Sequence, residues 1–245
     1  MMNYWISQTG AFTPSRVLKT ILYTNAALFI ISLIFSGRSV HTGFSPFHVL
    51  SPSMDALIFL GASGRLPIDT FQAWGSLITA NWLHGSLLHI VFNMLALKTV
   101  APLVMAEYGV FRMFTIYTLS GAAGFLLSVM GHVPVTIGAS AGLCGLIGAL
   151  LYFGRSRGGP WGHRVYQQTA GWIVSLALIG FLLPNINNWG HGGGLVAGIA
   201  LGWVLGYNDR KMENQAHRIL SVCLMGLTAL LLARPVIQGF FLILF

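Results

Sequence analysis

The sequence has very few charged residues, and acidic ones are the scarcest, with five aspartates and glutamates against thirteen lysines and arginines. Charged residues make up only 7% of the chain and hydrophobic residues 55%, whereas soluble domains are about a quarter charged. This composition leaves too little polar surface to face water. We therefore expect most of the surface to face lipid, in an integral, multi-pass membrane protein.

Cysteine is also scarce, and its placement excludes several kinds of site. Cys144 and Cys223 lie in apolar runs, which predicts neither a disulfide framework nor cysteine ligands for a metal. The net charge of +8 would suit a nucleic-acid partner. The basic residues fall in short connections between apolar runs, however, which is typical of membrane charge asymmetry. We therefore expect the lipid bilayer, and no nucleic acid, as a partner.

Long apolar runs predict an all-α, polytopic fold, because a spanning helix needs about 20 apolar residues. The first run is long and lacks a small-residue cleavage site, so we expect no signal peptide. Arg234-Pro235 interrupts the last run, which could kink there. The seven expected spans cover residues 17–36, 76–97, 111–130, 138–154, 167–183, 190–207 and 217–240.

Basic residues set the expected orientation, because they gather in the N-terminal segment and in every second connection. The positive-inside rule then predicts a cytoplasmic N-terminus and, with seven spans, an outer C-terminus. No organelle transit peptide is evident, which favours a bacterial plasma membrane. The expected regions are a cytoplasmic N-terminus (1–16), a six-helix core (17–207) with an ordered outer loop at 37–75, and a linker with a seventh helix (208–245).

Three polar constellations interrupt the apolar spans. The first, "HGSLLHIVFN", contains His84, His89 and Asn93; the second is Ser140; the third is His191 within "NWGHGGGLVAG". Buried polar groups are costly in lipid, so each is expected to face the bundle interior and to mark a functional site. The histidines and the serine lie in the first half of spans that run from outside to inside. This placement predicts that they meet in the outer half of the membrane.

Glycines on two of the spans predict how these constellations meet. Glycine recurs at every fourth position from 190 to 206, and again at 138, 142 and 145, where Ala149 continues the series. Small-residue stripes let helices pack closely in membranes. If the two stripes face each other, Ser140 and His191 meet near the same end. The glycines themselves are then scaffold.

Ser140 and His191 together suit nucleophilic catalysis. A serine hydroxyl is a weak nucleophile until a base takes its proton, and imidazole accepts a proton near neutral pH. The five acidic residues fall on the cytoplasmic side or in the outer loop, so we expect a dyad and not a triad. The helix start at Ser140 leaves backbone N–H groups for an oxyanion, to which His89 and Asn93 add donors.

Metal catalysis is the rival interpretation of three histidines. His84 and His89 are five residues apart and have no acidic residue beside them, unlike the HExxH pattern of zinc hydrolases. We therefore expect neither a metal nor a cofactor.

These motifs resemble those of the rhomboid intramembrane serine proteases, from about residue 70 to 207. "LITANWLHGSLLHIVFNMLAL" looks like the family's second helix, with its His-x4-His-x3-Asn pattern. "VAPLVMAEYGVFRMFTIYTLSGAAG" is similar to the connection into its third helix. "GASAG" resembles the nucleophile motif, and "NNWGHGGGLVAGIALG" resembles the sixth helix. Three motifs in order are a specific match.

The resemblance implies a role for each site residue. Ser140 would attack the scissile carbonyl, and His191 would act first as general base and then as general acid. His89, Asn93 and the Ser140 N–H would form the oxyanion hole. His84 would be structural and tie the outer loop to the helix end, with Gly138, Gly194 and Gly198 structural near the site. Substrates would be single-pass transmembrane helices cut near the outer membrane face, and the loop at 184–190 would be a mobile cap.

The sequence departs from the family's usual motifs in three places. Ala141 replaces a glycine after the nucleophile, Cys144 replaces an aromatic residue, and Gly75 follows Trp74 where arginine is common. The alternative function is therefore a catalytically inactive relative that binds transmembrane helices, although such relatives usually lose the serine or the histidine. A small-solute transporter would be expected to show internal repeats, and we find none.

Overall fold

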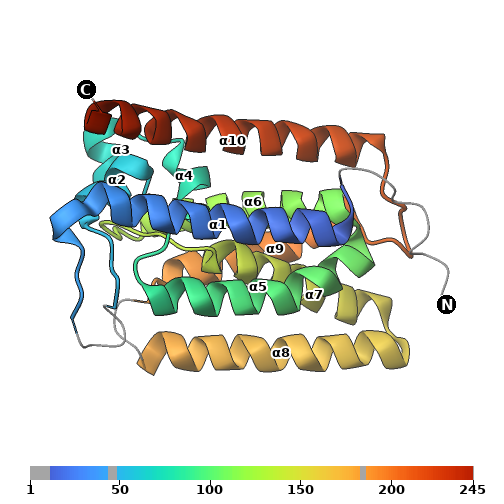
Figure 1. Ribbon diagram of the computed structural model, residues 1–245. Coiled ribbons are helices and arrows are strands. Elements are labelled where there is room, and N and C mark those ends of the chain that lie inside the picture. Colours follow the sequence, from blue (N-terminus) through green and yellow to red (C-terminus); the bar gives the residue numbers. More distant parts are fainter. Residues whose placement is uncertain (1–11, 44–48, 183–185, 245) are drawn as a thin grey trace.

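The computed structural model describes residues 12–43, 49–182 and 186–244, which form a bundle of long helices (Figure 1). In the described residues the extended pairing is limited to two isolated β-bridges, so the all-α prediction is confirmed. The long helices are α1 (Pro14–Ser36), α5 (Leu87–Tyr108), α6 (Val110–Met130), α7 (Ser140–Arg157), α8 (Gly159–Leu182), α9 (Asn188–Leu205) and α10 (Gln215–Leu244).

Five of these helices, α1, α5, α6, α8 and α10, are long and apolar enough to cross a membrane. The other two, α7 and α9, have 18 residues each and are rich in glycine. They pack most closely against each other and against α6, whereas α8 and α10 lie on opposite outer sides of the bundle (Figure 1). The fold is thus polytopic, as predicted, with its glycine-rich helices in the centre.

The second span differs from its prediction at 76–97. Residues 76–82 form only a short helix, α4 (Ser76–Thr79), and the 3-10 turn η3 (Ala80–Trp82), and α5 then runs from Leu87 to Tyr108. Ser86 starts α5 as its N-cap, because its hydroxyl accepts the His89 backbone N–H at 3.2 Å. Apolar residues beyond Lys98 continue the helix until Gly109, whose φ of 90° ends it. His84 therefore lies just before the helix and not inside it.

The predicted outer loop at 37–75 contains its own short elements. These are η1 (Gly37–Ser39), α2 (Met54–Leu60) and α3 (Arg65–Phe71), while residues 44–48 lie outside the described residues. Ser63 and Thr136 pair by two backbone hydrogen bonds of 3.0 and 2.7 Å. This bridge joins the loop to the segment that leads into α7, so the described part of the loop is ordered, as expected.

Close backbone contact between α7 and α9 explains the glycine stripe of α9. A Cβ atom at Gly198 would collide with the Gly145 carbonyl oxygen, and one at Gly194 with the Ala141 carbonyl oxygen. The prediction for the α7 stripe is only partly right. Gly142 faces Tyr117 of α6, and Gly138 lies before the helix. A Cβ atom at Gly145 would likewise collide with Ser120 of α6, although the Gly145 backbone lies against Gly198 and so takes part in the close α7–α9 packing.

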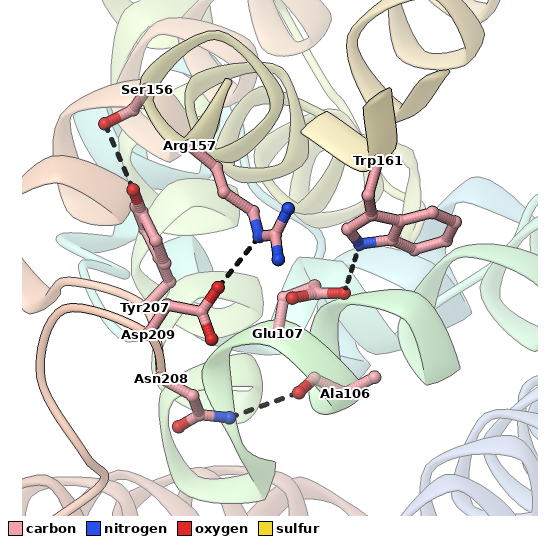
Figure 2. Close-up of polar contacts among 8 residues, drawn as sticks. All are labelled: Ala106, Glu107, Ser156, Arg157, Trp161, Tyr207, Asn208 and Asp209. Carbon is pink, nitrogen blue, oxygen red and sulfur yellow. Dashed lines mark hydrogen bonds and ion pairs between the residues drawn. The ribbon is translucent and has the colours of Figure 1, made fainter. Parts of the chain in front are cut away.

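The bundle has two chemically different ends. We call the end where α5, α7 and α9 begin the dyad end, and the end where these helices finish the far end. At the far end, polar side chains join helix ends (Figure 2). Arg157 pairs with Asp209 at 2.8 Å, and Trp161 Nε1 donates to Glu107 Oε1 at 3.0 Å. These contacts fasten the α7–α8 turn to the end of α5 and to the connection that follows α9.

Arg112, in the span predicted at 111–130, is fully buried near the start of α6. Its guanidinium donates to the carbonyl oxygens of Gly206 at 2.6 Å and Lys211 at 2.8 Å, to Asn208 Oδ1 at 2.6 Å, and to the Tyr108 carbonyl oxygen. A buried charge is tolerated only when it is hydrogen-bonded in this way. Arg112 thereby fixes the α9–α10 connection to the α5–α6 turn.

Candidate active site

Ser140 and His191 lie together at the dyad end. Ser140 is the first residue of α7, and His191 belongs to the first turn of α9. His191 Nε2 and Ser140 Oγ are 2.9 Å apart, although the residues are 51 positions apart in the chain. This is hydrogen-bond distance between a base and a hydroxyl, the geometry that activates a serine.

Gly138 allows the chain to turn into α7 at this point. Its φ is +122°, which favours glycine, and its N–H donates to the Ala80 carbonyl oxygen at 2.9 Å. A Cβ atom there would lie 2.7 Å from His89 Nε2, too close for any side chain. Glycine is thus required both by the turn and by the neighbouring His89 ring.

The hydrogen bonds of His89 fix the role of each ring nitrogen. Nδ1 accepts the Gly85 backbone N–H at 3.3 Å. A neutral imidazole that accepts at Nδ1 carries its proton on Nε2. Nε2 is the nitrogen beside Gly138, in the segment that leads directly to Ser140. His89 therefore presents an N–H donor on the Ser140 side.

Asn93 and His84 both contact His89. Asn93 is buried one turn below His89 and donates to the His89 carbonyl oxygen at 2.8 Å. His84 packs edge-on against the His89 ring, with a centroid distance of 5.1 Å. Burial, and to a smaller extent His89, lower the pKa of His84 well below its usual value. His84 is therefore neutral.

The expected link from His84 to the outer loop is not made by a hydrogen bond to any described residue, because both ring nitrogens are buried without a partner. His84 instead supports the ring of His89.

His191 Nδ1 is likewise buried and has no partner in the described part of the chain. No cluster of three or more histidine, cysteine or acidic residues that suits a metal occurs among residues 12–43, 49–182 and 186–244.

The two unusual residues after Ser140 are both buried. Ala141 packs with Ala80 and Phe125 in a small apolar cluster. Cys144 is 4% exposed and lies one turn further along α7. Neither side chain interrupts the contact between Ser140 and His191.

The predicted cap at 184–190 is partly outside the described residues (183–185), and α9 already begins at Asn188.

Sequence reasoning missed Asn187, the N-cap of α9. Its side chain hydrogen-bonds to Ser128, to Thr136 and to the Gly190 N–H. The available signal was an asparagine placed just before a helix that starts with glycine and histidine, since asparagine is a preferred N-cap. The partners themselves are distant in sequence and carry no local signal.

A family model described as the Rhomboid domain matches residues 70–208, more than half of the chain. The chain belongs to the rhomboid family. RHOMBOID-like protein 5 of Arabidopsis thaliana is 35% identical to this rhomboid over 167 residues, which cover 64% of this chain and 52% of the relative. RHOMBOID-like protein 1 of the same plant is 29% identical over 205 residues, covering 77% and 52%. Rhomboid protease GluP of Bacillus subtilis (strain 168) is 32% identical over 180 residues, covering 71% and 34%.

These matches confirm the resemblance found in the motifs, and this rhomboid is an integral membrane protein. It spans about half the length of the plant relatives just named and about a third of the Bacillus protein. The relatives come from plants and from a bacterium. A bacterial plasma membrane as the location therefore stays a prediction.

Proposed function

We propose that this rhomboid is an intramembrane serine endopeptidase in which Ser140 is the nucleophile and His191 the general base. The observation that carries the proposal is the 2.9 Å contact between His191 Nε2 and Ser140 Oγ. These groups meet at the starts of two helices that glycine packs closely together. The 32% identity to a protein named Rhomboid protease GluP adds support.

The proposed reaction has two halves. Ser140 Oγ attacks the scissile carbonyl while its proton passes to His191 Nε2, and His191 then protonates the leaving amine as the peptide bond breaks. Water next attacks the acyl-enzyme, and its proton passes to His191. His191 returns a proton to Ser140 Oγ, which releases the new carboxyl terminus. Both halves need only one base, so a dyad is sufficient.

His89, Asn93 and the backbone N–H of Ser140 would stabilise the oxyanion. The Gly85 N–H at Nδ1 of His89 leaves Nε2 as a donor on the Ser140 side. The first turn of α7 offers backbone N–H groups that have no partner within the helix. Asn93 holds the His89 backbone at 2.8 Å and has a second amide N–H to offer. Donors placed before the reaction are worth several kcal/mol in such sites.

The substrates would be single-pass transmembrane helices, cut near the outer face of the membrane. Large apolar side chains are exposed on the long helices, for example Phe92 on α5 at 65% and Val196 on α9 at 66%, which suits contact with lipid and with apolar helices. The far end carries basic residues, among them Arg155 and Lys211. By the positive-inside rule that end would face the cytoplasm, and the dyad would lie in the outer half.

The test compares wild type with Ser140→Ala and His191→Ala in cells that express a tagged single-pass reporter. We expect cleavage by wild type and a loss of at least about a thousandfold in both variants. A fluorophosphonate probe should label the wild-type protein and leave Ser140→Ala unlabelled. Melting in detergent should stay close to that of wild type, because Ser140 is partly exposed and its removal leaves only one partner free.

Two outcomes would contradict the proposal. Reporter cleavage by Ser140→Ala at the wild-type rate would exclude Ser140 as the nucleophile. Binding of the reporter by wild type without cleavage or labelling would favour the inactive, helix-binding alternative.

A further inference from the structure

Asn187 joins the two halves of the dyad more directly than its place in the sequence suggests. Its Oδ1 accepts the Gly190 N–H at 3.0 Å, and its backbone carbonyl oxygen accepts the His191 N–H at 3.1 Å. Its Nδ2 donates to Ser128 Oγ and to Thr136 Oγ1, each at 2.7 Å. Both polar atoms of the side chain are thus engaged, and their partners lie on α6, on the segment that leads to Ser140 and on the first turn of α9.

The two hydroxyl partners are themselves held in place. Ser128 is fully buried at the end of α6, and its hydroxyl donates to the Gly124 carbonyl oxygen at 2.9 Å. Thr136 exchanges backbone hydrogen bonds with Ser63 of the outer loop, and only three residues separate it from Ser140. Asn187 therefore connects the first turn of α9 to a rigid support on the Ser140 side.

The neighbouring Asn188 has the same side chain but a different connection. Its Nδ2 donates to the Gly180 carbonyl oxygen of α8 at 2.9 Å, so it joins α9 to a helix that carries no residue of the proposed site. The two asparagines have the same side chain and are neighbours at the start of α9. They differ in the segments to which their side chains hydrogen-bond. Asn188 is thus a matched control for Asn187.

We propose that Asn187 is a positioning residue that sets the approach of His191 to Ser140, by holding the start of α9 to Ser128 and Thr136. This inference rests on the proposed serine-protease function. An N-cap alone would require only an oxygen for the Gly190 N–H, which serine supplies as well as asparagine. The two amide donations to hydroxyls are what asparagine adds, and a serine side chain is too short to replace them.

The experiment measures the rate of fluorophosphonate labelling, kcat and KM for a transmembrane reporter, and melting in detergent, for Asn187→Ala, Asn187→Ser and Asn188→Ala. We expect labelling and kcat of both Asn187 variants to fall about tenfold to a hundredfold, because a shift of about 1 Å at a catalytic group has this effect. KM should change less than twofold. Asn188→Ala should label within about twofold of wild type, although it also loses a hydrogen bond.

Serine at position 187 separates positioning from capping. We expect Asn187→Ser to melt close to wild type and yet to label as slowly as Asn187→Ala. In a Thr136→Val background, Asn187→Ala should slow labelling by a smaller factor than it does in wild type, because one of its connections is already gone.

Several results would overturn the inference. Wild-type labelling of Asn187→Ser would show that the cap is sufficient. If Asn187→Ala and Asn188→Ala slow labelling equally, and in proportion to their loss of melting temperature, the effect is a general loss of stability. If the effects of Asn187→Ala and Thr136→Val on the labelling rate simply multiply, the two residues act separately. In all three cases wild type is labelled and the proposed function stands. Absence of labelling in wild type would remove the proposed function and this inference with it.

Discussion

At the dyad end several buried polar atoms have no hydrogen-bond partner among the described residues, whereas at the far end a dense set of polar side chains joins helix to helix. Both ring nitrogens of His84 and Nδ1 of His191 belong to the first group. The Arg112 guanidinium alone donates to five acceptors in the second, and Figure 2 shows further polar pairs at the far end.

This difference indicates that the dyad end serves the proposed chemistry and the far end stabilises the fold. Unpaired buried polar groups destabilise a fold, and they persist where chemistry needs donors and acceptors that are free for a substrate. Besides the hydrogen bonds of Asn187 to Ser128 and Thr136, such an end needs support from elsewhere in the bundle. The backbone contacts of α7 with α9 hold it from the middle of the bundle, and the hydrogen bonds of Arg112 fasten the opposite end of α9 to the α5–α6 turn.

The largest effect is expected from Gly198→Val, which removes the close packing that both ends share. The new side chain would collide with the Gly145 carbonyl oxygen, which is backbone and has nowhere to move. We expect a loss of about 3 kcal/mol in the free energy of unfolding, seen as a large fall in the detergent melting temperature. Proteolytic activity should disappear with the fold.

Gly171→Val is the control for this substitution. Gly171 lies on α8, and a Cβ atom there would have no atom within 4 Å. The control should melt close to wild type. If Gly198→Val also melts like wild type, the close packing of α7 and α9 does not hold the bundle together.

A loss of stability of similar size, but with labelling retained, is expected from Arg112→Met, which removes the guanidinium that joins several backbone carbonyl oxygens at the far end. The carbonyl oxygens of Gly206 and Lys211 would lose their donor, and water near the membrane surface would replace it only in part. We expect a loss of about 2–4 kcal/mol in the free energy of unfolding. The rate of Ser140 labelling per folded molecule should stay near wild type, because Arg112 lies at the end remote from the dyad.

Arg112→Met thus tests whether the two ends are independent. A loss of labelling with little change in melting would show that the far end controls the geometry of the dyad, and the division of tasks would be wrong. The corresponding variant at the dyad end is Ser140→Ala. It should abolish labelling and leave the melting temperature nearly unchanged.

The sequence predicted the helical class and the family, because each depends on patterns that lie within one segment. It also predicted that Ser140 and His191 meet, from glycine stripes on two separate spans, and the structure places Ser140 Oγ and His191 Nε2 2.9 Å apart. Apolar runs mark spans, and glycine repeats mark faces that pack closely. The second span was misplaced because apolar content alone does not show where a helix begins. The N-cap Ser86 decides that point, and hydropathy gives its hydroxyl no weight.

Contacts between distant segments could not be predicted in the same way. Arg112 lies by sequence at the edge of an apolar span, and only the folded chain brings the carbonyl oxygens of the α9–α10 connection to its guanidinium. Asn187 is a plausible cap by sequence, but its contacts with Ser128 and Thr136 join segments 59 and 51 positions away. Such pairings depend on helix packing, which no local pattern specifies.

The smallest effect is expected from Asp209→Asn, which breaks the ion pair with Arg157 at the same end as Arg112. The two side chains are 58% and 28% exposed, so water screens the pair, and holding both side chains in one geometry offsets part of the attraction. We expect a loss of less than about 1 kcal/mol in the free energy of unfolding, which decreases further as salt is raised. A loss as large as that of Arg112→Met, measured by melting in the same detergent, would show that the far end depends on its exposed charges. The expected result means that the far end is stabilised mainly by the buried Arg112 guanidinium. An exposed ion pair can exchange its partner for water, whereas a buried hydrogen bond cannot.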